Sequence, residues 1–159
     1  MIKFLLSDFS RVLLFPIDEN YAGSLNELHA ARLQDPSYTF FDTFSLNNQL
    51  LDWMAQAKLT HHLKIGMFTS ETIQEYPVLQ PFLNPVFDVV FSAKKLGLSK
   101  SDPQAYTTLC AQLNILPSET MYIDDAIPNV AAATTAGLHA VQFMATESTV
   151  AHAEALLNV

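Results

Sequence analysis

The chain has 159 residues, half of them apolar and 15% charged, which excludes a disordered chain and predicts a single domain over residues 1–159 with one buried core. Acidic residues outnumber basic ones by 16 to 8, for a formal net charge of −8. No basic cluster exceeds the pair Lys94-Lys95, so we expect neither nucleic acid nor an anionic membrane surface as a partner.

Five short apolar segments predict β-strands. They are continuous apolar runs rather than alternating ones, which is typical of strands covered on both faces in a parallel sheet. The predicted strands are residues 2–7, 64–69, 86–92, 120–124 and 139–143.

Helical patterns fall between these strands. Residues 46–59 carry an apolar stripe, and Asp102-Pro103 provides a cap residue and a first-turn proline. Residues 125–136 end before Gly137, and residues 147–157 form a last helix. This alternation predicts the α/β class, a Rossmann-like three-layer sandwich with a central parallel sheet.

The region from about residue 16 to residue 44 does not fit the alternation. We interpret it as a short helical insertion after the first strand that forms a small cap, with a helix over residues 24–33. Its aromatic residues could line a lid or make a homo-oligomer contact. They are Tyr38, Phe40, Phe41 and Phe44.

Polar side chains follow the predicted strands. In an open parallel sheet, ligands bind beyond the carboxyl ends of the strands, so these side chains should converge on one edge. Carboxylates hold Mg²⁺ and can attack phosphorus, while an ammonium and hydroxyls can neutralise a phosphoryl group. The set suits phosphoryl transfer and comprises Asp8, Thr69, Ser70, Lys100, Asp124 and Asp125.

Several of these residues also have a plainer structural explanation. Asp8 could cap a turn, Asp125 could be the N-cap of the next helix, and Thr69 and Ser70 could cap the helix that follows them. Lys100 could be a solvated loop lysine.

Four stretches resemble a known family. Residues 97–106 (GLSKSDPQAY) are similar to the family segment G-x-x-K-P-D-P-x-x-Y. Residues 121–130 (MYIDDAIPNV), together with Ala133 and Gly137, are similar to the family run I-D-D-x-x-x-N-V…A…G. Together with residues 5–8 and 68–70, they span nearly the whole chain outside the insertion. The sequence resembles the haloacid dehalogenase-like hydrolase superfamily, as a member with a reduced cap and a degenerate first motif.

The resemblance implies a Mg²⁺ site and a nucleophile. Asp8 would be the nucleophile and a metal ligand, and the backbone carbonyl of Ser10 would be a second metal contact. Asp124 would complete the site, with Asp125 ligating through water or shaping the loop.

The resemblance also implies a small phosphorylated substrate. Thr69, or Ser70 if the register slips by one, would bind the phosphoryl group. Lys100 would steady the nucleophile and the phosphate charge.

Two residues depart from the family pattern. Most phosphatases of the family have a second aspartate where this chain has Ser10, and that aspartate protonates the leaving oxygen and activates water. A serine hydroxyl is too weakly acidic for this role, so turnover should be slow. Arg11 stands where the family usually has glycine and could clamp a phosphate or carboxylate, or simply fill the site.

Three functions remain open. The first is a weakened Mg²⁺-dependent phosphatase, with Asp18, Glu19 and Asp42 of the insertion as candidates for the missing acid. The second is a catalytically inactive relative that binds a ligand or partner. The third is chemistry at carbon, as in the dehalogenases. The pair Asp124-Asp125 argues against this third function, because the dehalogenases need no metal and a metal-free site gains little from two adjacent carboxylates.

Other sites are excluded by residue counts. The single cysteine, Cys110, excludes an intrachain disulfide and zinc sites with paired cysteines. Four scattered glycines exclude a P-loop and a dinucleotide-binding fingerprint. The apolar N-terminal run is too short for a signal peptide, so we expect a cytoplasmic protein.

Overall fold

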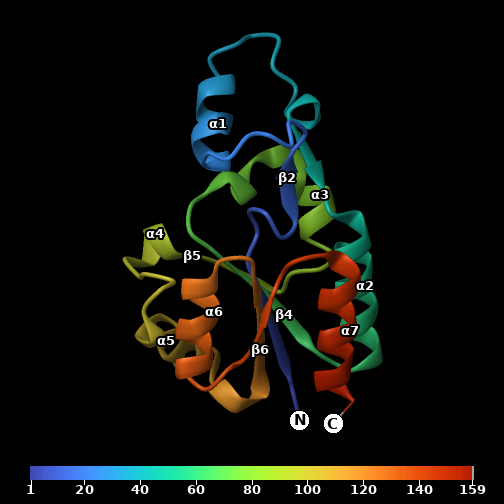
Figure 1. The fold of residues 1–159 in the computed structure, drawn as a ribbon, viewed down its shortest axis with the longest axis vertical. Coiled ribbons are helices and arrows are strands. Elements are labelled where there is room, and N and C mark those ends of the chain that lie inside the picture. Colours follow the sequence, from blue (N-terminus) through green and yellow to red (C-terminus); the bar gives the residue numbers. More distant parts are fainter. Residues whose placement is uncertain (159) are drawn as a thin grey trace.

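A computed structural model describes residues 1–158 and contains a five-stranded sheet whose neighbouring strands are all parallel (Figure 1). The strand order is β5-β4-β1-β6-β7. The predicted α/β, Rossmann-like architecture is confirmed. The strands are β1 (Phe4–Ser7), β4 (Lys64–Thr69), β5 (Val89–Ser92), β6 (Thr120–Asp124) and β7 (His139–Gln142).

Helices cover both faces of this sheet, which explains the continuous apolar runs. Helices α2 (Asn48–Thr60) and α7 (Thr146–Leu157) lie on one face, and α5 (Pro103–Leu113) and α6 (Ile127–Thr135) on the other (Figure 1). Alternate residues of β1 enter separate cores, because Leu5 belongs to one apolar cluster and Leu6 to another.

Local sequence determines several helix ends. The side chain of Asp102 accepts the backbone N–H of Gln104 at 2.9 Å and so caps α5, as predicted. Gly137 has a φ of 93° just beyond α6, and the Leu138 N–H returns to the Ala133 carbonyl at 3.0 Å.

The segment between β4 and β5 differs from the prediction. It forms short helices, which are the 3₁₀ turns Ile73–Glu75 and Pro77–Leu79 and the helix α3 (Gln80–Leu83). The N–H groups of Val86 and Phe87 both donate to the Leu83 carbonyl, so these residues end α3 and the strand begins only at Val89. A further short helix, α4 (Ala93–Leu96), follows β5, and a 3₁₀ turn (Pro117–Glu119) precedes β6.

The insertion stands beyond the carboxyl ends of the central strands (Figure 1). It contains the predicted helix, α1 (Leu25–Arg32), and a 3₁₀ turn (Phe40–Asp42). It joins the core through two antiparallel strands that were not predicted, β2 (Leu14–Pro16) and β3 (Phe44–Leu46). Its role as a cap stays a prediction.

The aromatic residues of the insertion pack inward. Phe40 and Phe44 are buried, and the Phe40 ring stacks on Tyr76 with centroids 5.3 Å apart. His29 of α1 lies edge-on to Tyr76 at 4.5 Å, and its Nδ1 is 2.9 Å from the Tyr38 hydroxyl. These rings join the insertion to residues 73–79, while a homo-oligomer contact stays a prediction. Among residues 1–158, no helix has the length and apolar character needed to cross a membrane.

Candidate active site

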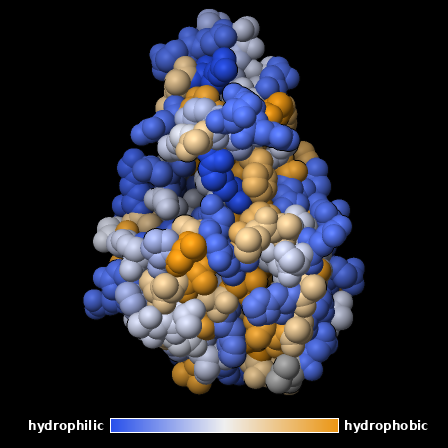
Figure 2. Space-filling model, in the orientation of Figure 1, coloured by the Kyte–Doolittle hydropathy of each residue, from blue (hydrophilic) through white to orange (hydrophobic). Residues whose placement is uncertain are grey.

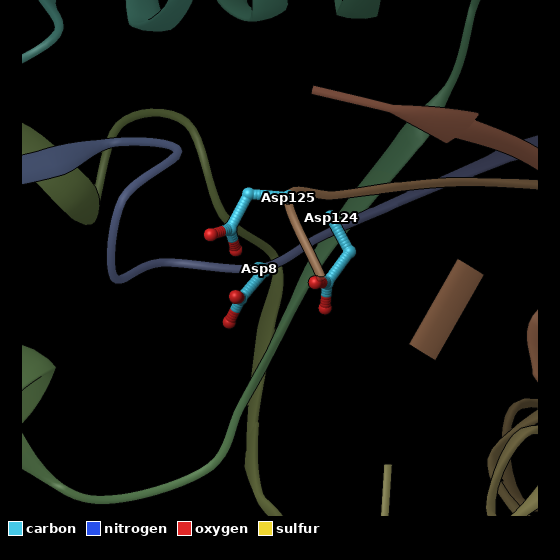
Figure 3. Close-up of side chains that lie close together, drawn as sticks. All are labelled: Asp8, Asp124 and Asp125. Atoms are coloured by element: carbon cyan, nitrogen blue, oxygen red, sulfur yellow. The ribbon is translucent and has the colours of Figure 1, made fainter. Parts of the chain in front are cut away.

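Three carboxylates gather where β1 and β6 end (Figure 3). Asp8 follows β1, Asp124 ends β6 and Asp125 comes next, and each offers an oxygen within 4.8 Å of the others. The parallel pairing of β1 with β6 produces this meeting, since the Asp8 N–H donates to the Ile123 carbonyl at 2.8 Å.

Lys100 connects two of these carboxylates. Its Nζ lies 2.7 Å from Asp8 Oδ1 and 2.7 Å from Asp124 Oδ2, and its side chain is only 4% exposed. The Tyr106 hydroxyl donates to the Lys100 carbonyl at 2.7 Å and so holds the loop in place. The alternative of a solvated loop lysine is therefore wrong.

Asp124 is held by donors on all sides. It accepts the Ala126 N–H at 2.8 Å and the Asn129 side-chain amide at 3.1 and 3.3 Å, and it also accepts the Tyr122 hydroxyl. Sequence reasoning missed Tyr122 and Asn129 as site residues. The signals were present, because Asn129 lies in the I-D-D-x-x-x-N-V run and Tyr122 is a polar ring within an apolar strand.

Burial perturbs the charges of the site. Burial raises the pKa of Asp8 to about 7, opposed by Lys100 and reinforced by Asp124. Burial, and then Asp124, also raise the pKa of Asp125. Burial alone would lower the pKa of Lys100, but Asp8 and Asp124 raise it above its ordinary value, so the ammonium stays charged.

The donor set fits a hard divalent cation. Three carboxylates face one ammonium, which leaves an excess of negative charge in a largely buried place. Carboxylate oxygens are the ligands that Mg²⁺ prefers, and a divalent ion would neutralise that excess.

Thr69 and Ser70 lie at the end of β4. Thr69 is buried and pairs in register with Ser92, whereas Ser70 is exposed and its carbonyl accepts the Lys94 N–H at 3.0 Å. Neither caps the turn that follows, because no side-chain cap bond is made there. A phosphoryl-binding role for either residue stays a prediction.

Other plain explanations fail as well. The residue at the N-cap of α6 is Ala126, so Asp125 is not the N-cap of that helix. The candidate acids Asp18, Glu19 and Asp42 are all exposed and lie outside the carboxylate cluster.

The two departures from the family pattern follow Asp8 directly. Ser10 Oγ is buried and has no hydrogen-bond partner within residues 1–158. Arg11 has a φ of 61°, and its Nη2 donates to the Tyr21 carbonyl at 3.0 Å and to the Gly23 carbonyl at 2.8 Å. That nitrogen is thus engaged within the chain, and the substrate-binding role of Arg11 stays a prediction.

Curated relatives match part of the chain. It is 36% identical over 70 residues to validoxylamine A 7'-phosphate phosphatase of Streptomyces hygroscopicus subsp. limoneus, covering 44% of this chain and 33% of that protein. It is 31% identical over 81 residues to phosphatase MT3486 of Mycobacterium tuberculosis (strain CDC 1551 / Oshkosh), covering 49% of this chain and 37% of that protein. The matched part is thus about a third of the length of either relative.

Solved structures share the fold at low identity. A putative β-phosphoglucomutase from Thermotoga maritima has a TM-score of 0.69 at 16% identity, covering 98% of this chain and all of that one. A HAD family enzyme from Bacteroides thetaiotaomicron, in complex with magnesium and inorganic phosphate, has a TM-score of 0.67 at 14% identity, covering 91% of this chain and 96% of that one.

A family model described as haloacid dehalogenase-like hydrolase matches residues 24–137, which is more than half of the chain. The match includes Thr69, Lys100 and the Asp124-Asp125 pair. This protein therefore belongs to the haloacid dehalogenase-like hydrolase family.

Proposed function

We propose that this chain is a Mg²⁺-dependent phosphatase that acts through an aspartyl-phosphate on Asp8, with turnover weakened by Ser10. The observation that carries the proposal is the buried Asp8 carboxylate, 2.7 Å from the Lys100 ammonium and within 4.8 Å of Asp124 and Asp125. Two curated relatives are phosphatases by name, which supports the same reaction.

The protein's own groups would divide the reaction between them. A carboxylate oxygen of Asp8 bonds to phosphorus while the bond from phosphorus to the ester oxygen breaks. Water then attacks the phosphorus of the aspartyl-phosphate, which frees inorganic phosphate and restores Asp8. Lys100 remains charged throughout and balances the negative charge on Asp8 and on the phosphoryl oxygens.

Asp8, Asp124 and Asp125, with the Ser10 carbonyl, would hold the ion. When bound, Mg²⁺ would neutralise the carboxylates and the phosphoryl oxygens and so let the anionic substrate approach.

Ser10 makes the rate depend on the leaving group. General acid–base assistance is typically worth about 10²–10⁴-fold, and a serine hydroxyl supplies none of it near neutral pH. The leaving oxygen must therefore depart as an anion or take its proton from water. Esters of acidic phenols should react far faster than esters of aliphatic alcohols.

The test compares p-nitrophenyl phosphate with phenyl phosphate in the presence of MgCl₂. The wild type should hydrolyse the first far faster, and Asp8→Asn should abolish both activities. Asp52→Asn, an exposed carboxylate on α2, is the matched control and should behave as wild type. Equal rates for wild type and Asp8→Asn would remove the phosphatase proposal.

The surroundings of Asp124 favour a second candidate, an inactive relative that binds a ligand or partner. A carboxylate has about four lone-pair sites, and the Ala126 N–H, the Asn129 amide, the Tyr122 hydroxyl and Lys100 already surround this one. Ser10→Asp separates the two candidates. A rise in phenyl phosphate turnover of about 10²-fold indicates a weakened enzyme, and no change favours binding.

A further inference from the structure

Arg11 adopts a backbone conformation that arginine rarely takes. Its φ of 61° lies in the left-handed region, where a Cβ atom is unfavourable. The turn that imposes this angle is tight, because the Arg11 N–H donates to the Leu14 carbonyl at 2.7 Å and the Leu13 N–H donates to the Phe9 carbonyl at 2.8 Å. Such strain persists only where other contacts compensate for it.

The compensating contacts are made by the guanidinium group. Its Nη2 reaches the carbonyls of Tyr21 and Gly23, which lie just before α1. The accepting turn is also held by contacts of its own. The Tyr21 hydroxyl donates to the Ser24 carbonyl at 3.0 Å, and the Tyr21 ring fills the space that a Cβ on Gly23 would need, with its hydroxyl only 2.5 Å from that position.

A second tether, from another loop, holds the first turn of α1, which directly follows the segment that Arg11 contacts. Asn26 Oδ1 accepts the N–H groups of Thr72 and Ile73 at 3.2 and 2.9 Å. These two residues follow Thr69 and Ser70 along the chain. The segment leading into α1 is therefore bound to the loop after Asp8, and the first turn of α1 is bound to the loop after Thr69. These two loops follow the predicted nucleophile and the predicted phosphoryl-binding hydroxyls.

The Asn26 tether lies beside a cavity of about 630 Å³ between α1 and residues 71–77, and Asn26, Thr72 and Ile73 all line it. Asn26 and His29 of α1 form one wall, and Thr72 and Tyr76 form the opposite one. In the shared orientation of Figures 1 and 2, α1 lies at the narrow upper end of the molecule, and the surface there is mostly hydrophilic. A shift of α1 would change the width of this cavity, because α1 forms one of its walls.

We propose that Arg11 is a positioning residue that acts together with Asn26 to fix α1 over the strand ends, so that the insertion controls how an ester reaches Asp8. The access part of this proposal rests on the proposed function, whereas the tether itself does not. Arginine in place of the family's usual glycine then has a physical role, in which two charge-assisted hydrogen bonds offset the strained backbone.

Hydrogen exchange of the full chain tests the tether without any substrate. Arg11→Gly removes both guanidinium bonds and relieves the strained φ, and Asn26→Ala removes the other tether. Each should speed exchange of the α1 amides by about tenfold and leave β6 unchanged. Lys58→Met is the matched control. It also removes a hydrogen bond from a basic side chain to a backbone carbonyl, that of Val86 at 3.1 Å, but neither residue belongs to the insertion. Unchanged α1 exchange in Arg11→Gly would overturn the proposal.

Steady-state kinetics then separate positioning from direct substrate binding. If both residues act by positioning α1, Arg11→Gly and Asn26→Ala change the KM for p-nitrophenyl phosphate in the same direction, and inhibition by inorganic phosphate stays unchanged in both. If Arg11→Gly alone weakens phosphate inhibition by about tenfold, Arg11 binds the anion itself and the proposal fails. If wild type hydrolyses no ester, the proposed function fails, and the exchange data alone decide on the tether.

Discussion

Removing the Lys100 ammonium should reveal how strongly the site depends on it. In Lys100→Met, a side chain of similar length keeps the packing but leaves Asp8 and Asp124 buried without the cation that lies 2.7 Å from each. Breaking a buried ion pair by removing one partner typically costs about 3–5 kcal/mol. We expect a loss of that size in the free energy of unfolding at pH 8 in the absence of divalent ions.

The loss should shrink in acid. Burial already raises the pKa of Asp8 to about 7, and Lys100 is the main group that opposes this rise, so the pKa of Asp8 should be higher still in Lys100→Met. A carboxyl whose pKa is raised in the folded state stabilises the fold below its unfolded value of 3.8, and this contribution is lost as pH rises through the folded value. At pH 5.5, Asp8 of the variant takes up a proton and needs no partner.

Urea unfolding at pH 5.5, 7 and 8 measures both effects. Lys58→Met is the control, because the pair Lys58–Asp88 is partly exposed and should cost only about 0–1 kcal/mol. If Lys100→Met is no less stable than Lys58→Met at pH 8, or if its deficit stays constant down to pH 5.5, the electrostatic account of the site is wrong.

Three further predictions concern the ion, His29 and Gly137. MgCl₂ at about 100 times its dissociation constant should stabilise wild type by about 2.7 kcal/mol in thermal unfolding. Asp8→Asn should lose most of this stabilisation, and EDTA should reverse it in wild type. Burial lowers the pKa of His29 in the folded protein. The neutral His29 side chain therefore contributes to stability above the ordinary pKa of 6.5, and this contribution is lost as pH falls. Between pH 7.5 and 5, His29→Gln should therefore lose less stability than wild type. Gly137→Ala should lower stability by about 1–2 kcal/mol, because the φ of 93° is unfavourable for alanine. The added Cβ itself would meet only Pro117, at an ordinary contact distance of 3.5 Å. A melting temperature equal to that of wild type would contradict this prediction.

Sequence patterns predicted the inner strands of the central sheet well because these strands are almost entirely buried. Residues 64–69 and 120–124 are continuous apolar runs that contain no competing helical pattern, and the structure has strands with the same bounds. The strands β2 and β3 escaped prediction since each has three residues and pairs only across the whole insertion. Val86 and Phe87 look like strand residues by composition, yet their N–H groups are used by the turn that ends α3.

The acidic part of the site followed from one rule, that polar side chains at the ends of parallel strands converge. This rule places Asp8 near Asp124 without any knowledge of side-chain contacts. It does not identify Asn26 or Tyr122, because their roles depend on which backbone or carboxylate group faces them after folding. Asn26 lies outside every motif of the sequence, and only the approach of Thr72 and Ile73 gives it a partner.

The three carboxylates differ in how far the protein itself satisfies them. Asp124 is held by Tyr122, Ala126, Asn129 and Lys100, whereas the ion-pair partner of Asp8 is Lys100. Burial also raises the pKa of both Asp8 and Asp125, which means that their charged forms are poorly compensated by the fold. A bound cation should therefore stabilise Asp8 and Asp125 most, and Asp124 should act mainly as a rigid support. Asp125→Asn should thus weaken the stabilisation by Mg²⁺ in thermal unfolding more than Tyr122→Phe does. If Tyr122→Phe weakens this stabilisation more than Asp125→Asn, Asp124 has the main role in holding the ion.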